Sequence, residues 1–455
     1  MDYFRSVTAA LVTCTCLLSS CLETATVPQK YQGVATTTFD YATSVTYTAS
    51  VSFPNWKPTA ESTGIYFEVY AESPLDGAVL KSGLKPVFCS YTKSDGTWKG
   101  TIEIPAYVKS LYIYAPDATE NQVQEVSISG TQFSVACTAS DIASSASGTM
   151  INREMLSDVY LFEDTYPDPG DNDLNDLVVQ VDKFRHIGIY ESGNERVACL
   201  NYEKFRFTTF ENVSSGDNGL AVEFVLGNNI ILSNIKNILF TIDGRYMFTE
   251  EDMYPTSTGY YFYITPDIHR RTENCRYILA KKMNDDKAWT WSGHTVELTV
   301  YYYNPNDGVN TTVDLNDIAA GQSKVRPFVY RWEEDCENEF AWEVHVPYET
   351  PSPLATDYRR NFFSEDIYTY FQTLDDGSEP ENGMFYTRST SEGRYRPYPF
   401  AVKLSGVEVL NSNLYNLLLP SNDKSPIDSL FTTFTDWVED QATDRAGTYD
   451  NWYLK

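Results

Sequence analysis

The stretch Val296-Glu297-Leu298-Thr299-Val300-Tyr301-Tyr302-Tyr303 decides the fold class, and the run Asn304-Pro305-Asn306-Asp307-Gly308 follows it directly. β-Branched and aromatic residues favour strands, whereas Asn, Pro, Asp and Gly favour the turns that end them. Similar strand-forming runs lie on its N-terminal side at 177–181, 220–225 and 260–264. The sequence therefore predicts a mainly β protein built from antiparallel β-sandwich domains.

Shorter runs of the same kind occupy residues 46–140 and alternate with turn signals such as Ser94-Asp95-Gly96. The strand-like runs are 65–70, 98–105 and 111–114. This spacing predicts a small antiparallel sandwich at 46–140, bounded by the serine-rich stretch 140–148. A second β-rich domain is expected at 155–455.

One short helix is predicted near the C-terminus. Ser425 can cap it, Pro426 suits its first position, and Asp428 favours the positive end of its dipole. Apolar residues then recur at helical spacing, namely Ile427, Leu430, Phe431, Phe434, Trp437 and Val438. We expect this amphipathic helix to pack its apolar stripe on a sheet.

Residues 1–20 have the features of a signal peptide. Arg5 precedes an apolar run at 7–18, which as a helix would span roughly 18 Å of the roughly 30 Å hydrocarbon core of a bilayer. Leu18-Ser19-Ser20-Cys21 resembles the lipobox of bacterial lipoproteins, in which the cysteine receives a lipid. We therefore expect a lipid on Cys21, a linker at 21–45, and an outer-membrane protein that faces the cell surface or the periplasm. An ordinary secretory signal is the alternative.

The charge balance restricts the classes of partner. The chain has 34 basic and 63 acidic residues, which gives a net charge of −29. Such a surface repels phosphate backbones and anionic lipid headgroups, so nucleic acid is not an expected partner. The lipid anchor is the expected attachment to the membrane.

Five cysteines remain after Cys21, and none of them has the spacing of a zinc site. Cys89 and Cys137 lie in the same predicted domain and can pair. The alternative is that both are buried free thiols in strands, which is the more common state of such residues.

The segment that carries chemistry is Phe162-Glu163-Asp164-Thr165-Tyr166-Pro167-Asp168-Pro169-Gly170-Asp171-Asn172-Asp173-Leu174-Asn175-Asp176-Leu177-Val178-Val179. Carboxylates packed this closely repel one another, and a calcium ion would offset that repulsion with oxygen ligands. The candidate ligands are Asp164, Asp168, Asp171, Asp173, Asn175 and Asp176. An EF-hand is not expected, because Asp176 replaces the turn glycine and a strand follows. The alternative is a set of turns in which the side chains cap backbone amides.

The pattern Phe-Glu-Asp-x-x-Pro-x-x-Gly-Asp-x-Asp-x-Asn-Asp-Leu-Val-Val at 162–179 resembles the hallmark of the LruC domain family of bacterial, especially Bacteroidota, lipoproteins. The family usually has Phe where this chain has Leu174. Weaker likenesses at 218–224, 343–347, 399–402 and 434–453 extend the resemblance over 155–455. It implies an envelope lipoprotein and supplies no catalytic residues.

The sequence predicts a non-enzyme. Its four histidines are His186, His269, His294 and His345, and they form none of the usual zinc or catalytic motifs. We expect an anchored binding, adhesion or scaffolding module with an unknown protein or glycan ligand. One alternative is a carbohydrate-binding lipoprotein, which 34 tyrosines would suit, and a weaker one is a hydrolase in which His345 takes part.

Overall fold

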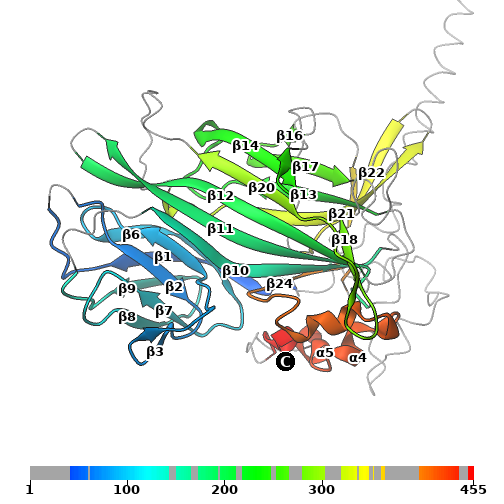
Figure 1. The fold of residues 1–455 in the computed structure, drawn as a ribbon, viewed down its shortest axis with the longest axis horizontal. Coiled ribbons are helices and arrows are strands. Elements are labelled where there is room, and N and C mark those ends of the chain that lie inside the picture. The colour runs from blue at the N-terminus through cyan, green and yellow to red at the C-terminus, as the bar shows by residue number, and fades with distance from the viewer. Residues whose placement is uncertain are drawn as a thin grey trace, which may run out of the picture.

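Strands make up most of the part of the chain that the computed structural model describes (Figure 1). The described residues are 41–59, 62–142, 150–164, 173–192, 195–211, 218–246, 253–265, 279–302, 319–335, 338–347, 352, 360–363, 399–439 and 449–454. Most of the described strand pairs are antiparallel, so the predicted mainly β fold class is confirmed.

Several predicted features lie outside the described residues. They are the signal peptide at 1–20, Cys21, the linker up to residue 40, most of the boundary at 140–148, and the turn at 304–308. The folded part begins before the predicted residue 46, because Tyr41 is buried and the first strand starts at Ser44.

The N-terminal sandwich has two sheets with the strand orders β6-β1-β9 and β5-β2-β7-β8. Its strands are β1 Ser44–Ser52, β2 Tyr66–Tyr70, β5 Phe88–Tyr91, β6 Thr97–Pro105, β7 Ser110–Tyr114, β8 Val123–Ser127 and β9 Gln132–Ala136, with the small hairpin β3 Leu75–Asp76 and β4 Val79–Leu80. β1 and β9 run parallel. The Trp98 ring of one sheet lies 5.5 Å from Phe67 and 5.3 Å from Phe88 of the other, so aromatic side chains fill the space between the sheets.

A larger sandwich follows, and three long strands, β10, β11 and β12, form the middle of its nine-stranded sheet (Figure 1). The strands of this sheet are β10 Ile151–Phe162, β11 Leu177–Ser192, β12 Glu195–Glu211, β14 Ile235–Ile242, β15 Arg245–Tyr246, β18 Ala280–Met283, β19 Trp289–Trp291, β20 Val296–Tyr302 and β24 Ala401–Ser405. The main order is β15-β14-β20-β12-β11-β10-β24, so a strand from the C-terminal part closes one edge.

The second sheet of the larger sandwich has the order β16-β17-β13-β21-β22-β23. Its strands are β13 Gly219–Val225, β16 Met253–Pro255, β17 Gly259–Thr265, β21 Lys324–Asp335, β22 Asn338–Val344 and β23 Arg360–Phe363. Phe240 of β14 lies 5.4 Å from Phe262 of β17, and Phe205 of β12 lies 6.1 Å from Phe224 of β13. These contacts show that the two sheets pack face to face.

The predicted C-terminal helix is two short helices, α4 Ile427–Leu430 and α5 Phe434–Glu439, so the prediction of one continuous helix is wrong. The chain leaves helical geometry at Phe431 (φ −123°, ψ 83°), which places that ring 5.5 Å from Trp452. Ser425 does not cap α4, because the capping position falls one residue later, on Pro426. The apolar stripe is nevertheless buried: Phe434 lies 4.9 Å from Trp452, and Trp437 lies 5.9 Å from Tyr41.

Short 3-10 helices complete this end of the molecule, which lies beside one end of β10 and β24 in Figure 1. They are η5 Asn413–Leu418, η6 Pro420–Asn422 and η8 Trp452–Leu454, and a further one, η2 Leu232–Asn234, precedes β14.

Among the described residues, no helix is long and apolar enough to cross a bilayer.

A buried ionic network joins the two sandwiches. Lys403 of β24 lies 2.7 Å from a carboxylate oxygen of Glu103 in β6 and 3.6 Å from one of Asp158 in β10. Lys324 pairs with Glu103 at 3.2 Å, and Lys183 pairs with Asp158 at 2.9 Å. The two sandwiches are therefore tied together by charged groups as well as by apolar packing.

Cys89 and Cys137 do not form a disulfide. Both are free and buried, as is Cys199, which agrees with the alternative of buried thiols. Burial raises the pKa of Cys89 to about 11 and that of Cys137 to about 12, so both stay protonated and unreactive at neutral pH.

Candidate metal centre

The acidic segment connects two neighbouring antiparallel strands. β10 ends at Phe162 and β11 begins at Leu177, and these two residues are register partners. Glu163 and Asp176 therefore follow and precede paired strand ends, which brings them together at the base of the loop. The pairing of β10 with β24 extends by one bond here, because the Glu163 N–H donates to the Phe400 carbonyl at 2.9 Å.

Three buried carboxylates converge at this point. Glu163, Asp173 and Asp176 each offer one oxygen, and these oxygens all lie within 4.8 Å of one another. The exposed fractions of the three residues are 0, 1 and 8 %, so water screens their charges very little.

Backbone amides orient each of the three carboxylates. Glu163 Oε1 accepts from the Leu174 N–H at 2.9 Å, and Asp176 Oδ2 accepts from the Asp164 N–H at 2.8 Å. Asp173 Oδ2 accepts from the Lys424 N–H at 3.0 Å, so the turn before α4 also takes part. The arrangement thus depends on chain segments that are about 250 residues apart in sequence, as the separation of 251 between Asp173 and Lys424 shows.

The loop includes a strained backbone position. Leu174 is fully buried and has a φ of +54°, in the left-handed region that residues other than glycine avoid. Such a conformation costs of order 1–3 kcal/mol and persists only where the surroundings enforce it. Here it directs the Leu174 N–H at Glu163 while the side chain stays in the core.

The electrostatics of the cluster favour a positively charged occupant. Burial, followed by the charges of Glu163, Asp164 and Asp173, holds the pKa of Asp176 well above its usual value, and the hydrogen bond from the Asp164 backbone opposes this only in part. A buried group of like charges is relieved either by a proton or by a cation. A divalent ion would relieve all of these carboxylates at once.

The residues present fit calcium. Oxygens that bind one calcium ion at 2.3–2.6 Å lie no more than about 5 Å apart, and the three carboxylate oxygens meet this limit. The neighbouring Asn175 side chain is fully buried, and within the described residues neither its Oδ1 nor its Nδ2 has a hydrogen-bond partner. Buried amides are normally satisfied, and an amide oxygen is a usual calcium ligand.

The sequence found part of this centre. Of the predicted ligands, Asp173 and Asp176 belong to the cluster; Asn175 and Asp164 are buried beside them in the chain. Asp168 and Asp171 lie outside the described residues. Glu163 was not among the predicted ligands. Glu163 directly follows β10, and Asp176 directly precedes β11, which pairs with β10, so this strand pairing could have identified Glu163.

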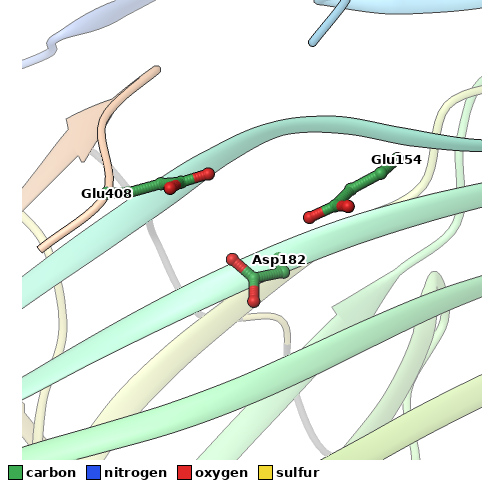
Figure 2. A group of neighbouring side chains, drawn as sticks. All are labelled: Glu154, Asp182 and Glu408. Carbon is green, nitrogen blue, oxygen red and sulfur yellow. The ribbon is translucent and has the colours of Figure 1, made fainter. Parts of the chain in front are cut away.

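A second group of carboxylates lies farther along the same two strands. Glu154 of β10, Asp182 of β11 and Glu408, which follows β24, point toward one another (Figure 2). Lys85 of the N-terminal sandwich pairs with Glu154 at 2.7 Å and also with Glu408. Ser157 and Gln180 each donate to Asp182 at 2.8 Å. A lysine and two neutral donors thus already satisfy this group, which we regard as a structural contact.

His345, the histidine considered for a hydrolase, is part of the core. It is 2 % exposed, its Nε2 lies 2.8 Å from Glu343 Oε2, and its ring stacks on Phe328 with a centroid distance of 4.3 Å. Tyr263 donates to the other oxygen of Glu343 at 2.7 Å. This setting matches a histidine bonded at a strand end more closely than a group exposed to substrate.

Comparison with known proteins adds a family match for the N-terminal sandwich. Residues 46–137 match DUF8469, a domain of unknown function. No curated protein matches the chain. The matched segment ends before residue 155, so the LruC resemblance of residues 155–455 stays a prediction.

Two solved structures have a weak likeness to the chain. The crystal structure of a "putative lipoprotein" from Bacteroides ovatus is 12% identical, has a TM-score of 0.39, and the likeness covers 87% of this chain and 98% of that one. The full-length RrgB pilus protein from Streptococcus pneumoniae is 10% identical, has a TM-score of 0.14, and the likeness covers 70% and 59% of the two chains. Both TM-scores are below 0.5, so neither structure assigns a function to this chain.

Proposed function

We propose that this chain is a lipid-anchored protein of the cell envelope whose folded part is a calcium-stabilised, non-enzymatic binding scaffold. The observation that carries the proposal is the buried cluster of Glu163, Asp173 and Asp176, next in sequence to Asn175, whose buried amide has no hydrogen-bond partner among the described residues. The lipobox-like sequence that ends at Cys21 supports the anchor.

A cation at this centre would hold three parts of the chain together. Glu163 directly follows β10, Asp176 directly precedes β11, and Asp173 accepts a hydrogen bond from the Lys424 N–H before α4. Binding energy released at such a point stabilises the folded state, because the ligands are not assembled in the unfolded chain. The ion would therefore act as a cross-link at the end of the larger sandwich.

The burial of the ligands supports a structural role for the ion. A catalytic metal keeps a coordination position open for water or substrate. In this centre all three carboxylates are buried, and their backbone partners fix their orientation. The buried His345 gives no support to a hydrolase either, so a scaffold fits the described residues best.

Calcium binding is tested directly by isothermal titration of the purified chain after dialysis against a chelator. We expect one site with a dissociation constant between about 10⁻⁷ and 10⁻³ M, the range of sensor and extracellular calcium sites. Asp173→Asn should weaken binding by tenfold or more, since it removes one anionic ligand. Glu154→Gln, in the carboxylate group that Lys85 satisfies, is the matched control and should bind as wild type. No heat of binding, or an effect of Glu154→Gln in place of Asp173→Asn, would contradict the assignment.

The anchor is tested by fractionation of cells that express the full chain. Wild type should stay with the membranes through an alkaline wash, because a covalently attached lipid holds it there. Cys21→Ser should move the chain to the soluble fraction. Cys16→Ser, a thiol of the predicted signal segment, is the matched control and should stay anchored. A Cys21→Ser chain that remains on the membrane would rule out lipid at this residue.

A further inference from the structure

A pocket outside the metal centre lies where the DUF8469 domain meets the larger sandwich. It is open to solvent and has a volume of about 430 Å³, which is toward the small end of the range for ligand pockets. The DUF8469 domain contributes Lys93, Asp95, Trp98 and Lys99 to its lining, and the larger sandwich contributes Asn229 and Ala320. A ligand here would contact both parts of the chain.

Buried hydrogen bonds hold the Ala320 wall in place. The carbonyl of Ala319 accepts from Ser90 Oγ at 2.9 Å and from an Arg185 guanidinium nitrogen at 2.8 Å. The carbonyl of Gly321 accepts from the other terminal nitrogen of Arg185 at 2.7 Å. Since Arg185 is 2 % exposed and also pairs with Glu203 at 2.9 Å, this wall is rigid.

The turn that carries Lys93 and Asp95 and the turn that carries Asn229 form the other two walls of the pocket, and both are ordered without a ligand. In the turn between β5 and β6, the Lys93 N–H donates to the Thr97 carbonyl at 2.7 Å, and Asp95 Oδ1 accepts from the Thr97 N–H at 2.9 Å. In the turn after β13, the Gly227 N–H donates to Ser323 Oγ at 3.2 Å, and Asn229 takes a φ of +69°. A pocket whose walls are already ordered loses little entropy when it binds a ligand.

The lining combines an aromatic side chain with donors and acceptors of both kinds. Trp98 is 3 % exposed and packs among the aromatic rings of the DUF8469 core, while Lys99 and Asn229 are exposed. The Asn229 amide both donates and accepts, and the second oxygen of Asp95 can accept. Such a mixture suits a ring with several hydroxyl groups better than an apolar ligand.

The local charge is opposite to that of the whole chain. The pocket has two lysines and one aspartate, whereas the chain has a net charge of −29. At moderate salt, screening limits the range over which a charge acts to about 10 Å. A ligand inside the pocket therefore experiences mainly the two ammonium groups. The local balance therefore favours an anion.

We propose that this pocket binds a sugar that carries a carboxylate, such as a hexuronic acid unit of an acidic glycan. Lys99 pairs with the carboxylate, and Asn229 and Asp95 bind ring hydroxyls. The proposal gives a ligand class to the binding role proposed above, and it depends on neither the anchor nor the calcium ion.

Isothermal titration of the purified full chain with glucuronate, glucose and acetate tests the site. We expect glucuronate to bind with a dissociation constant of about 1 mM, as ligand efficiency gives for a single ring. Glucose has the hydroxylated ring without the carboxylate, and acetate has the carboxylate without the ring. Each should therefore bind at least tenfold more weakly than glucuronate. Equal binding of glucose would overturn the carboxylate assignment, and equal binding of acetate would reduce the site to a simple anion site.

Substitutions of residues that line the pocket test whether glucuronate binds there. Lys99→Ala and Asn229→Ala should each weaken glucuronate binding, the former by about tenfold, the effect of removing a hydrogen bond to a charged group. Lys109→Ala, an exposed lysine of the same domain that does not line the pocket, is the matched control. An unchanged melting temperature in chelator shows that each variant is folded, and because this readout does not involve calcium, failure of this proposal is distinguished from failure of the calcium proposal. Absence of glucuronate binding by wild type, or binding that survives both substitutions, would overturn it.

Discussion

Replacing Lys403 by methionine is expected to lower the free energy of unfolding by about 3–5 kcal/mol, the usual cost of removing one partner from a buried ion pair. The Lys403 side chain is 3 % exposed and lies between Glu103 and Asp158 at 2.7 and 3.6 Å. Methionine keeps the length of the side chain but leaves the buried Asp158 carboxylate and the partly buried Glu103 carboxylate with less positive charge around them. Urea denaturation followed by tryptophan fluorescence measures the loss.

A matched control separates burial from charge. Lys204→Met removes a half-exposed ammonium that lies 3.5 Å from Glu297, and it should cost less than about 1 kcal/mol. Adding Glu103→Gln to Lys403→Met should restore part of the lost stability, since it removes one of the two carboxylates whose charge Lys403 no longer offsets. A Lys403→Met chain as stable as the Lys204→Met chain would show that the network does not stabilise the fold.

The structure also predicts how the stability of Lys403→Met changes with pH. Burial alone would raise the pKa of Glu103, but Lys403, Lys324 and Lys183 outweigh it and hold that pKa well below 4.5. The pKa of Asp158 is also lowered, because Lys183 and Lys403 outweigh burial. A carboxylate whose pKa is lowered in the folded state stabilises the fold at pH values above its ordinary pKa. This stabilisation is lost as the pH falls through the lowered pKa. In Lys403→Met the values are lowered less, so its acid-induced loss should still begin near the ordinary pKa values, but it should end at a higher pH and be smaller.

This network also shows what the sequence could not predict. The strands were predictable because side-chain type and turn residues act locally, and the runs at 98–105 and 177–181 lie in β6 and β11 as expected. The pairing of Glu103 with Lys403 joins residues 300 positions apart. No local pattern marks either residue, because a lysine in a strand usually faces solvent.

The same limit applies to the metal centre and to the C-terminal helix. The density of acids at 162–179 indicated Asp173 and Asp176, since crowded carboxylates need compensation whatever the fold. Glu163 enters only through the pairing of β10 with β11, and Lys424 only through the tertiary fold. In the helix, the periodicity identified the buried face correctly. The break at Phe431 depends on its contact with Trp452, which the periodicity does not include.

Asp176→Asn should change sign in its effect on stability when calcium is added. Without calcium the variant is expected to be more stable than wild type by about 1 kcal/mol, the typical size of a single-substitution effect. It removes a buried charge that Glu163, Asp164 and Asp173 repel, while the amide oxygen can still accept from the Asp164 N–H. In calcium at about 100 times the dissociation constant, wild type should gain about 2.7 kcal/mol and the variant less, because it has lost an anionic ligand.

Differential scanning calorimetry in chelator and in calcium measures this reversal. The alternative, in which the acidic side chains only cap turns, predicts that Asp176→Asn is neutral or destabilising and that calcium shifts neither melting temperature. Glu154→Gln is again the control, and its response to calcium should equal that of wild type, because its carboxylate belongs to the group that Lys85 satisfies. A wild-type chain that melts above Asp176→Asn in chelator would show that the cluster is stable without a cation. The buried Asn175 amide would then need another partner.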